Sequence, residues 1–422
     1  MKQITVAIIG MGSRGANAYA CCQKKFPEKM RIVAVADPDE EKRRIAREEY
    51  GVSPDMLFET AEQLLRREKL ADVAFICTPD SQHYAQACRA LELGYDLLLE
   101  KPISNRPEQC AEIARLAEKK GRQVVVCHVL RYTPFYREIK RMLDAGEIGT
   151  LVSVQAIEKV CYWHQAHSFV RGNWRNSDLS SPMILQKCCH DMDIFLWLTG
   201  KHCKKVSSFG SLTYFRPENA PENAAERCLD CGAKDACPYN AERFYMDRLR
   251  DGGDWPVNVL HPAPTEENIS RALREGPYGR CVFRCDNNVV DHQVVNLLME
   301  DGVTVNFTMC AFTAKGGRQI RLMGTQGEIV GDMEANEIRL CPFGREEQVV
   351  DVRTLASDFS GHGGGDVEMV REFLDLTAGE GAGSALTSVD RSVESHMVAF
   401  AAEKSRLNQG ACVDMQAFAT ES

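Results

Sequence analysis

Short runs of apolar residues alternate with longer amphipathic stretches over the first 128 residues of the chain. Uninterrupted apolar runs of this length are typical of strands buried on both faces of a parallel sheet, and the stretches between them indicate helices. The expected strands are Thr5–Ile9, Ile32–Ala36, Val73–Cys77, Asp96–Leu99 and Val124–Cys127, and the expected helices are Asp39–Tyr50, Ser81–Leu93 and Pro107–Lys119. The pattern predicts an α/β fold that begins with a doubly wound Rossmann domain over residues 1–128.

The pattern changes near residue 149, where longer runs alternate apolar and polar positions, as in a sheet with one covered face. The expected elements are strands at Val152–Ile157, Val206–Tyr214, Val289–Met299 and Val303–Phe312, and helices at Met183–Leu198 and Val367–Leu376. Residues 216–288 are rich in Pro, Gly, Asn and Cys and are expected to form an irregular insertion. We predict a second, α+β domain over residues 129–422, with a large, mostly antiparallel open sheet.

The first apolar run leads directly into the motif G-x-G-x-x-G at residues 10–15. Gly10 permits a tight turn, Gly12 lets the backbone approach a pyrophosphate, and Gly15 lets the following helix pack closely. The motif after a strand predicts a dinucleotide site. The loop residues expected to contact the cofactor are Gly10, Gly12, Ser13, Arg14 and Gly15.

The second apolar run ends in Asp37, about 20 residues after the glycine motif. A carboxylate at this place accepts hydrogen bonds from the adenosine ribose hydroxyls and repels a 2′-phosphate. The sequence therefore favours NAD as the cofactor. NADP is the alternative, because Lys42, Arg43 and Arg44 follow closely.

The formal net charge of the 422-residue chain is −9 at pH 7, which argues against nucleic acid or an anionic membrane as a partner. No apolar stretch approaches the roughly 20 residues needed to cross a bilayer, and the apolar start is explained as a strand rather than a signal peptide. The 18 cysteines are scattered along the whole chain and are expected to be mostly reduced thiols. We therefore expect a cytoplasmic protein.

Two further motifs follow expected strands: T-P-x-x-x-H at residues 78–83 and E-K-P at residues 100–102. An H-x-x-D motif at residues 190–193 lies on an expected helix of the second domain. Together with the glycine motif, this set resembles the Gfo/Idh/MocA oxidoreductases, the family of glucose–fructose oxidoreductase and inositol dehydrogenase. The resemblance spans most of the chain, except for the insertion. It implies that the cofactor is also contacted by Thr78, Pro79, His83, Glu100 and Lys101.

The resemblance also implies the chemistry, which is oxidation of a secondary hydroxyl of a sugar or polyol by the nicotinamide. That reaction needs a base for the hydroxyl proton and a cation that stabilises the developing alkoxide. Lys101 suits the role of the cation, and His190 suits the role of the base. The resemblance further implies a homo-oligomer, a dimer or a tetramer, paired through the second sheet.

The chain departs from the family pattern four residues before His190, where the family usually carries an aspartate and this chain has Gln186. On one continuous helix, Gln186, Lys187 and His190 would project toward one pocket. A nearby Lys187 would lower the pKa of His190 and favour its neutral form. The residues expected to bind substrate are His128, Arg131, His167, Arg171, Trp174, Arg175, Gln186 and Lys187, with His292 and His362 as weaker candidates.

The cysteines of the insertion form a separate pattern, C-x-x-C at residues 228–231 with further thiols downstream. Tetrahedral zinc takes four such ligands, and a loop-rich insertion gains stability from a bound metal. We expect structural zinc, with an iron–sulfur cluster as the main rival. The expected metal ligands are Cys228, Cys231, Cys237 and either Cys281 or Cys285.

Three functions follow from these features. The first is an NAD(P)-dependent oxidoreductase that acts on a sugar, polyol or glycoside. The second is an NAD-dependent glycoside-cleaving enzyme that works by transient oxidation, elimination and re-reduction, which the altered residues around Gln186 and the large insertion favour. The third is a cofactor-binding sensor, against which the presence of both Lys101 and His190 argues.

Overall fold

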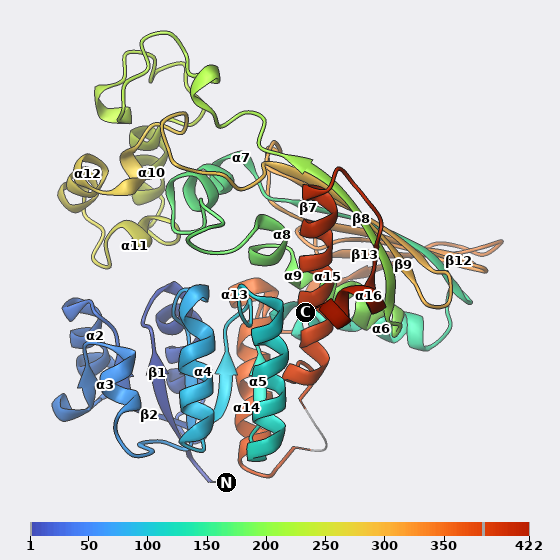
Figure 1. Cartoon of the computed structure of the whole chain (residues 1–422), viewed down its shortest axis with the longest axis horizontal. Helices are drawn as coiled ribbons and strands as arrows, with labels where there is room; N and C mark the ends of the chain where they lie inside the picture. Colours follow the sequence, from blue (N-terminus) through green and yellow to red (C-terminus); the bar gives the residue numbers. More distant parts are fainter. Residues whose placement is uncertain (1, 382–384, 422) are drawn as a thin grey trace.

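The computed structural model describes residues 2–381 and 385–421. Two sheets dominate it (Figure 1). In the described chain, the first sheet has six parallel strands in the order β3-β2-β1-β4-β5-β6. These strands are β1 (Ile4–Ile9), β2 (Met30–Ala36), β3 (Leu57–Phe58), β4 (Val73–Ile76), β5 (Asp96–Leu99) and β6 (Val124–Val126). The predicted doubly wound sheet is confirmed.

Helices cover both faces of this sheet. The first face packs against η1 (Ser13–Ala20, a π-helix), α1 (Cys22–Lys25), α2 (Glu40–Tyr50) and α14 (Gly365–Thr377). The other face packs against α3 (Ala61–Leu65), α4 (His83–Glu92), α5 (Pro107–Lys120) and part of α15 (Val389–Leu407). The N-cap Asp39 accepts a hydrogen bond from the Glu41 N–H at the start of α2, and Gly51 ends the helix with a positive φ of 70°.

The chain returns to the first sheet after it has built the second. Phe373 of α14 is fully buried, and its ring centroid lies 6.0 Å from that of Phe75 on β4. The core of the first sheet therefore contains residues from both ends of the chain. The limits of the two domains stay a prediction.

The second sheet of the described chain has the order β14-β13-β12-β11-β7-β10-β9-β8-β15. Its strands are β7 (Leu151–Lys159), β8 (Cys203–Ser211), β9 (His292–Met299), β10 (Thr304–Cys310), β11 (Gly317–Gly324), β12 (Gly327–Asp332), β13 (Glu337–Pro342), β14 (Gln348–Asp351) and β15 (Val413–Asp414). Only β7 and β10 pair in parallel within these residues. This confirms the predicted large, mostly antiparallel sheet.

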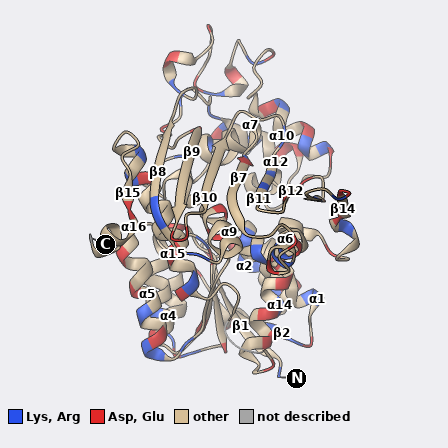
Figure 2. Cartoon of the chain, turned by 90° about the vertical axis from the view of Figure 1, so that its right-hand side faces the viewer, with Lys and Arg blue, Asp and Glu red and all other residues tan. Residues whose placement is uncertain are grey.

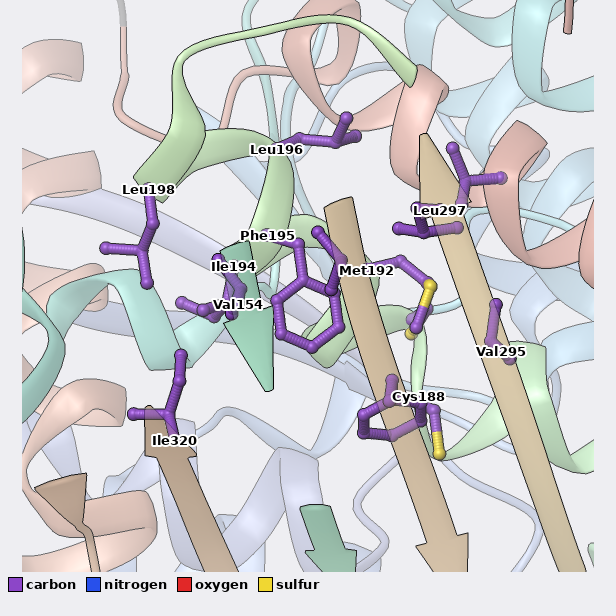
Figure 3. Close-up of a cluster of buried hydrophobic side chains, with 14 of the residues drawn as sticks. Val154, Cys188, Met192, Ile194, Phe195, Leu196, Leu198, Val295, Leu297 and Ile320 are labelled. Carbon is purple, nitrogen blue, oxygen red and sulfur yellow. The ribbon is translucent and has the colours of Figure 1, made fainter. Parts of the chain in front are cut away.

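One face of the second sheet is covered by α9 (Cys189–Thr199) and by α15. Figure 3 shows Met192 and Phe195 of α9 directed at strand residues such as Val154 and Val295. Burial of these apolar side chains holds the helix that carries His190 against the sheet.

The insertion is more regular than expected. It contains α10 (Ala241–Arg250), α11 (Val257–Leu260) and α12 (Glu266–Glu275), so the prediction of an irregular segment is wrong for these helices and is confirmed for most of the chain around them. The helices pack around their own small core, which includes Tyr245, Ile269 and Leu273. Strands β11 to β14 and the helix α6 (Pro134–Asp144) were also not predicted.

The remaining helical segments of the described chain have seven residues or fewer. They are η2 (Pro54–Met56), η3 (Asp80–Gln82), η4 (Val129–Tyr132), α7 (Tyr162–His164), η5 (Gln165–Arg171), α8 (Met183–Gln186), η6 (Pro217–Asn219), η7 (Cys228–Asp230), η8 (Pro277–Gly279), η9 (Val352–Thr354), α13 (Ser360–Gly363) and α16 (Met415–Glu421). Acidic and basic residues are interspersed along the outer helices (Figure 2). Among the described helices, none is both long and apolar enough to cross a bilayer.

Candidate active site

The glycine loop adopts the conformation that its sequence requires. Gly10 has a φ of +94°, and a Cβ there would lie 2.8 Å from the carbonyl oxygen of Cys77. A Cβ on Gly15 would lie 1.9 Å from the carbonyl oxygen of Gly10. A Cβ on Gly12 would meet no atom within 4 Å in the described chain, so the backbone at Gly12 is open to a phosphate group.

Asp37 lies beside this loop at the end of β2. Its carboxylate accepts hydrogen bonds from the Met11 N–H at 2.7 Å and the Asp39 N–H at 2.9 Å. Among the basic residues that follow, Lys42 comes within 3.8 Å of Asp37, while Arg43 donates to the Asp37 carbonyl and extends to Glu59. The carboxylate is thus fixed against the glycine loop.

Arg14 of the glycine loop points into the protein. Its guanidinium bonds Glu100 at 2.6 Å, and it contacts both carboxylate oxygens of Asp366 at 2.6 and 3.1 Å. Burial alone would raise the pKa of Asp366, but Arg14 and His362 hold that pKa well below its ordinary value. An ion-pair network therefore joins the glycine loop, the E-K-P motif and the glycine cluster before α14.

His83 joins the T-P-x-x-x-H and E-K-P motifs. Its Nδ1 lies 2.7 Å from the carbonyl oxygen of Pro102, and its Nε2 lies 2.8 Å from that of Thr78. The ring is buried, with both nitrogens directed at backbone. His83 is thus placed to support the two loops, whereas Ser13 and Pro79 are exposed beside them.

Lys101 connects the first sheet to the helices of the second domain. Its Nζ donates a hydrogen bond of 2.7 Å to the carbonyl oxygen of Gln186. The carbonyl lies at the end of α8, where the predicted helix Met183–Leu198 is interrupted at Lys187 and Cys188. The prediction of one continuous helix is wrong, and the interruption separates Gln186 and Lys187 from the helix that carries His190.

His190 lies in the first turn of α9 and is almost fully buried. Burial lowers its pKa well below the ordinary value, and the positive charge of Lys101 acts in the same direction. Its Nδ1 has no hydrogen-bond partner in the described chain. The imidazole is therefore neutral at neutral pH and able to accept a proton.

Lys187 is not among the main groups that lower the pKa of His190, contrary to the prediction. Its Nζ lies 3.4 Å from Glu158, which also pairs with Arg318 at 2.8 Å. Arg318 binds both oxygens of Asp191, next to His190, at 2.8 and 3.1 Å. The positive charges beside His190 come from Lys101 and Arg318, because Lys187 is directed at Glu158.

His362 was a weaker candidate in the sequence, yet it lies next to His190. The two ring centroids are 6.1 Å apart. Its Nδ1 lies 3.1 Å from Asp366, and the side chain is 41% exposed, so the ring is both oriented and accessible. The glycines around it indicated a linker, although the aspartate four residues later was the available signal for an oriented histidine.

Two predicted substrate residues lie behind the site. His128 is fully buried, with its ring centroid 5.7 Å from that of His190. Arg131 forms a two-pronged ion pair with Asp193 at 2.7 and 2.6 Å. Both residues support α9 from within the protein.

The predicted substrate residues of η5 and the loop after it are held by the insertion and the adjoining chain instead. Each has a protein partner: His167 contacts Tyr245, Arg171 contacts Arg280 and Tyr239, Trp174 packs near Phe169, and Arg175 pairs with Asp286. His292 lies on β9 beside Asp291. The printed partners of these side chains are protein groups other than Lys101 and His190.

Four of the five candidate metal ligands share a cavity. Cys228, Cys231, Cys237 and Cys281 line it, and its volume of about 10 Å³ is roughly the room of one water molecule. Among the described residues, no three His, Cys, Asp or Glu side chains are grouped to hold a metal ion. The zinc prediction is therefore not confirmed.

Comparison with protein families agrees with this geometry. Residues 4–128 match the model described as "Oxidoreductase family, NAD-binding Rossmann fold", and residues 136–235 match the "GFO/IDH/MocA C-terminal domain". The chain belongs to the Gfo/Idh/MocA family, and it is an NAD(P)-binding oxidoreductase.

The relatives include proteins named as oxidoreductases and as inositol 2-dehydrogenases. "Putative oxidoreductase YteT" of Bacillus subtilis (strain 168) is 23% identical over 89% of this chain and 86% of its own length. "Inositol 2-dehydrogenase 1" of Saccharopolyspora erythraea is 27% identical over 48% of this chain and 57% of its own. The WlbA dehydrogenase from Bordetella pertussis, solved in complex with NADH and UDP-GlcNAcA, has the same fold, with a TM-score of 0.69, 14% identity and coverage of 98% and 99%.

Proposed function

We propose that the protein oxidises a secondary hydroxyl of a sugar, polyol or glycoside with NAD(P). The observation that carries this proposal is the bond from Lys101 Nζ to the Gln186 carbonyl, which brings the E-K-P motif to the helices that carry His190. A cation and a neutral histidine are the two groups that alcohol oxidation requires.

The open backbone at Gly12 and the fixed carboxylate of Asp37 fit a dinucleotide. The glycine loop would hold the pyrophosphate, and Asp37 would hold the adenosine ribose. When bound, the nicotinamide accepts the hydride from the substrate carbon. We favour NAD over NADP, because the Asp37 carboxylate repels a 2′-phosphate and Arg44 is paired with Glu41 and Glu48.

Lys101 and His190 would supply the cation and the base that the reaction requires. Lys101 Nζ stabilises the negative charge that develops on the reacting oxygen. His190 accepts the hydroxyl proton, because burial and the charge of Lys101 keep its ring neutral. The buried Gln186 Oε1 has no hydrogen-bond partner among the described residues and would accept a hydrogen bond from a second hydroxyl.

The proposal is tested with Lys101→Met and His190→Asn, measured by NADH formation on a panel of sugars and inositols. We expect each variant to lose about 100-fold or more in kcat. Lys204→Met and His202→Asn, on the exposed surface, are the matched controls and keep full activity. Wild-type protein that binds neither NAD nor NADP would overturn the proposal.

The second candidate is redox-assisted glycoside cleavage, which the pairing of His362 with Asp366 favours. Elimination requires an acid that protonates the departing glycosidic oxygen, in addition to the base that accepts the first proton. His362 supplies a second oriented imidazole 6.1 Å from His190. Release of the leaving group from aryl glycosides without net NADH formation distinguishes this reaction from a dehydrogenase.

We also propose that the insertion binds structural zinc through Cys228, Cys231, Cys237 and Cys281. The shared cavity supports this set, and its lining favours Cys281 over Cys285 as the fourth ligand. Metal analysis of the purified protein should find about one zinc per chain. Cys231→Ser should lose the metal and Cys285→Ser should keep it, while iron in place of zinc would identify the cluster instead.

For the assembly we propose a cytoplasmic homo-oligomer, a dimer or a tetramer. The support is the resemblance to the family together with the second sheet, whose strands β9 and β10 expose Asn296 and Asn306 on one face. Light scattering of the purified protein measures its mass, and a monomer would contradict this proposal.

A further inference from the structure

An aromatic surface lies beside the candidate active site and has no role in the proposed chemistry. It consists of Trp163 on α7 and Phe244 and Trp255 of the insertion. The ring centroid of Trp163 lies 5.3 Å from that of Phe244, and the two ring planes are nearly parallel. The Trp163 centroid lies 5.4 Å from that of Trp255. Trp255 is 40% exposed. Figure 1 shows α10, which carries Phe244, beside α7.

His164 links this surface to the catalytic residues. Its ring stacks on Trp163 at 5.7 Å and meets Trp255 edge-on at 5.0 Å. His164 lies on α7, which closely follows β7, and Glu158 near the end of β7 pairs with Lys187 at 3.4 Å and with Arg318 at 2.8 Å. Arg318 in turn binds Asp191, next to His190, so the segment that carries the aromatic surface leads from the ion pairs of the site.

The chemistry of the surface selects among ligands. Trp163 is packed by Phe244, His164 and Arg248, which leaves Trp255 as the exposed indole of this surface. An exposed indole packs against flat apolar groups, such as the C–H face of a pyranose or an aryl ring. Arg248 lies 5.1 Å above Trp163 and 5.8 Å from Phe244, which fixes the rings by cation–π contact and disfavours a cationic ligand. A neutral ring is therefore the best occupant.

We propose that Trp255, supported by Trp163, forms a subsite for a second ring of the substrate, so that the substrate is a glycoside with a sugar or aryl aglycone. This inference rests on the proposed carbohydrate oxidation or cleavage. The oxidised sugar would lie at Lys101 and His190, and its aglycone would extend toward Trp255. Because Trp255 belongs to the insertion, the insertion would contribute to substrate specificity.

The test compares phenyl and methyl glycosides of the same sugars, which differ only in the second ring. In wild-type protein with NAD, kcat/KM for turnover should be at least tenfold higher for the phenyl glycoside. Trp255→Ala and Trp163→Ala should remove this preference and leave the methyl glycoside within about twofold. Trp255→Phe should restore most of it, and Phe343→Ala, an exposed aromatic on another loop, should change nothing.

Two results would overturn the inference: equal kcat/KM for both glycosides in wild-type protein, or an equal loss on both in Trp255→Ala. Failure of the proposed function gives a different result, in which no glycoside of either kind is turned over. Calorimetry still decides the subsite in that event. The subsite would be supported if wild-type protein binds the phenyl glycoside and Trp255→Ala does not. It would be overturned if wild-type protein does not bind the phenyl glycoside.

Discussion

At the scale of single residues, the site depends on contacts between groups far apart in the chain. Arg14 matches the expected place in the glycine loop, but its partner Asp366 comes from the segment before α14. Lys101 matches its motif, and its contact with the Gln186 carbonyl depends on a break between two helices. Motifs in the sequence thus identified these residues, while their partners come from distant parts of the chain.

The Arg14–Asp366 ion pair should stabilise the glycine loop for cofactor binding. Asp366→Asn leaves Glu100 as the carboxylate partner of Arg14 among the described residues, and loss of one partner of a buried pair costs about 3–5 kcal/mol. We expect a lower unfolding midpoint and at least tenfold weaker NAD binding by calorimetry. Asp358→Asn, on an exposed pair with Lys25, is the control. Unchanged NAD affinity in Asp366→Asn would contradict this role.

Asp37 should set the choice between NAD and NADP. We expect wild-type protein to favour NAD by at least tenfold in kcat/KM, and Asp37→Ser to narrow that ratio by removing the charge that repels a 2′-phosphate. Asp39→Asn keeps a cap for α2 and should keep the preference. A wild-type preference for NADP would show that the positive charge of Lys42 affects the choice of cofactor more than the negative charge of Asp37.

At the scale of elements, the periodicity of apolar residues predicted a helix correctly where the helix is amphipathic and continuous. It failed at α8 and α9, because apolar residues fill both segments and the turn at Lys187 and Cys188 leaves no gap in the pattern. It also failed in the insertion, where Pro, Gly and Cys residues surround helices that are stabilised by a local core.

The late helix α14 should be part of the stability of the first sheet. Phe373→Ala removes a fully buried ring that packs against Phe75, which should cost about 3–5 kcal/mol. Denaturant unfolding of the full chain measures the shift in midpoint. Leu407→Ala, at a side chain 66% exposed, should change it little. A small effect of Phe373→Ala would mean that α14 is dispensable for the first core.

At the scale of the whole molecule, buried histidines predict acid sensitivity. Burial lowers the pKa of His128 and His190 well below the ordinary value, and lowers the pKa of His167 and His396 to about 3. Below about pH 6.5, the unfolded chain takes up protons at these histidines and the folded chain does not. Stability should therefore fall as the pH drops from about 6.5 to 5, with a slope that approaches about 1.4 kcal/mol per pH unit for each histidine.

Thermal unfolding at a series of pH values measures this slope. His396→Gln retains an acceptor for the Ile103 N–H. It should reduce the dependence of the unfolding free energy on pH by the contribution of one histidine. The exposed His202, whose pKa is raised by Glu394, provides the contrasting variant His202→Gln. Equal slopes in wild-type protein and His396→Gln would contradict the assignment.

The sequence by itself determined the Rossmann fold, the dinucleotide loop and the family, because these depend on local periodicity and on short motifs whose spacing is fixed by backbone geometry. Only the tertiary structure decided that α14 completes the first core, that Lys187 pairs with Glu158 and that His362 lies beside His190. Such contacts depend on how distant segments pack, which short-range patterns do not encode. The same packing decided that Trp255 of the insertion lies next to His164, and with it the proposal of a second-ring subsite.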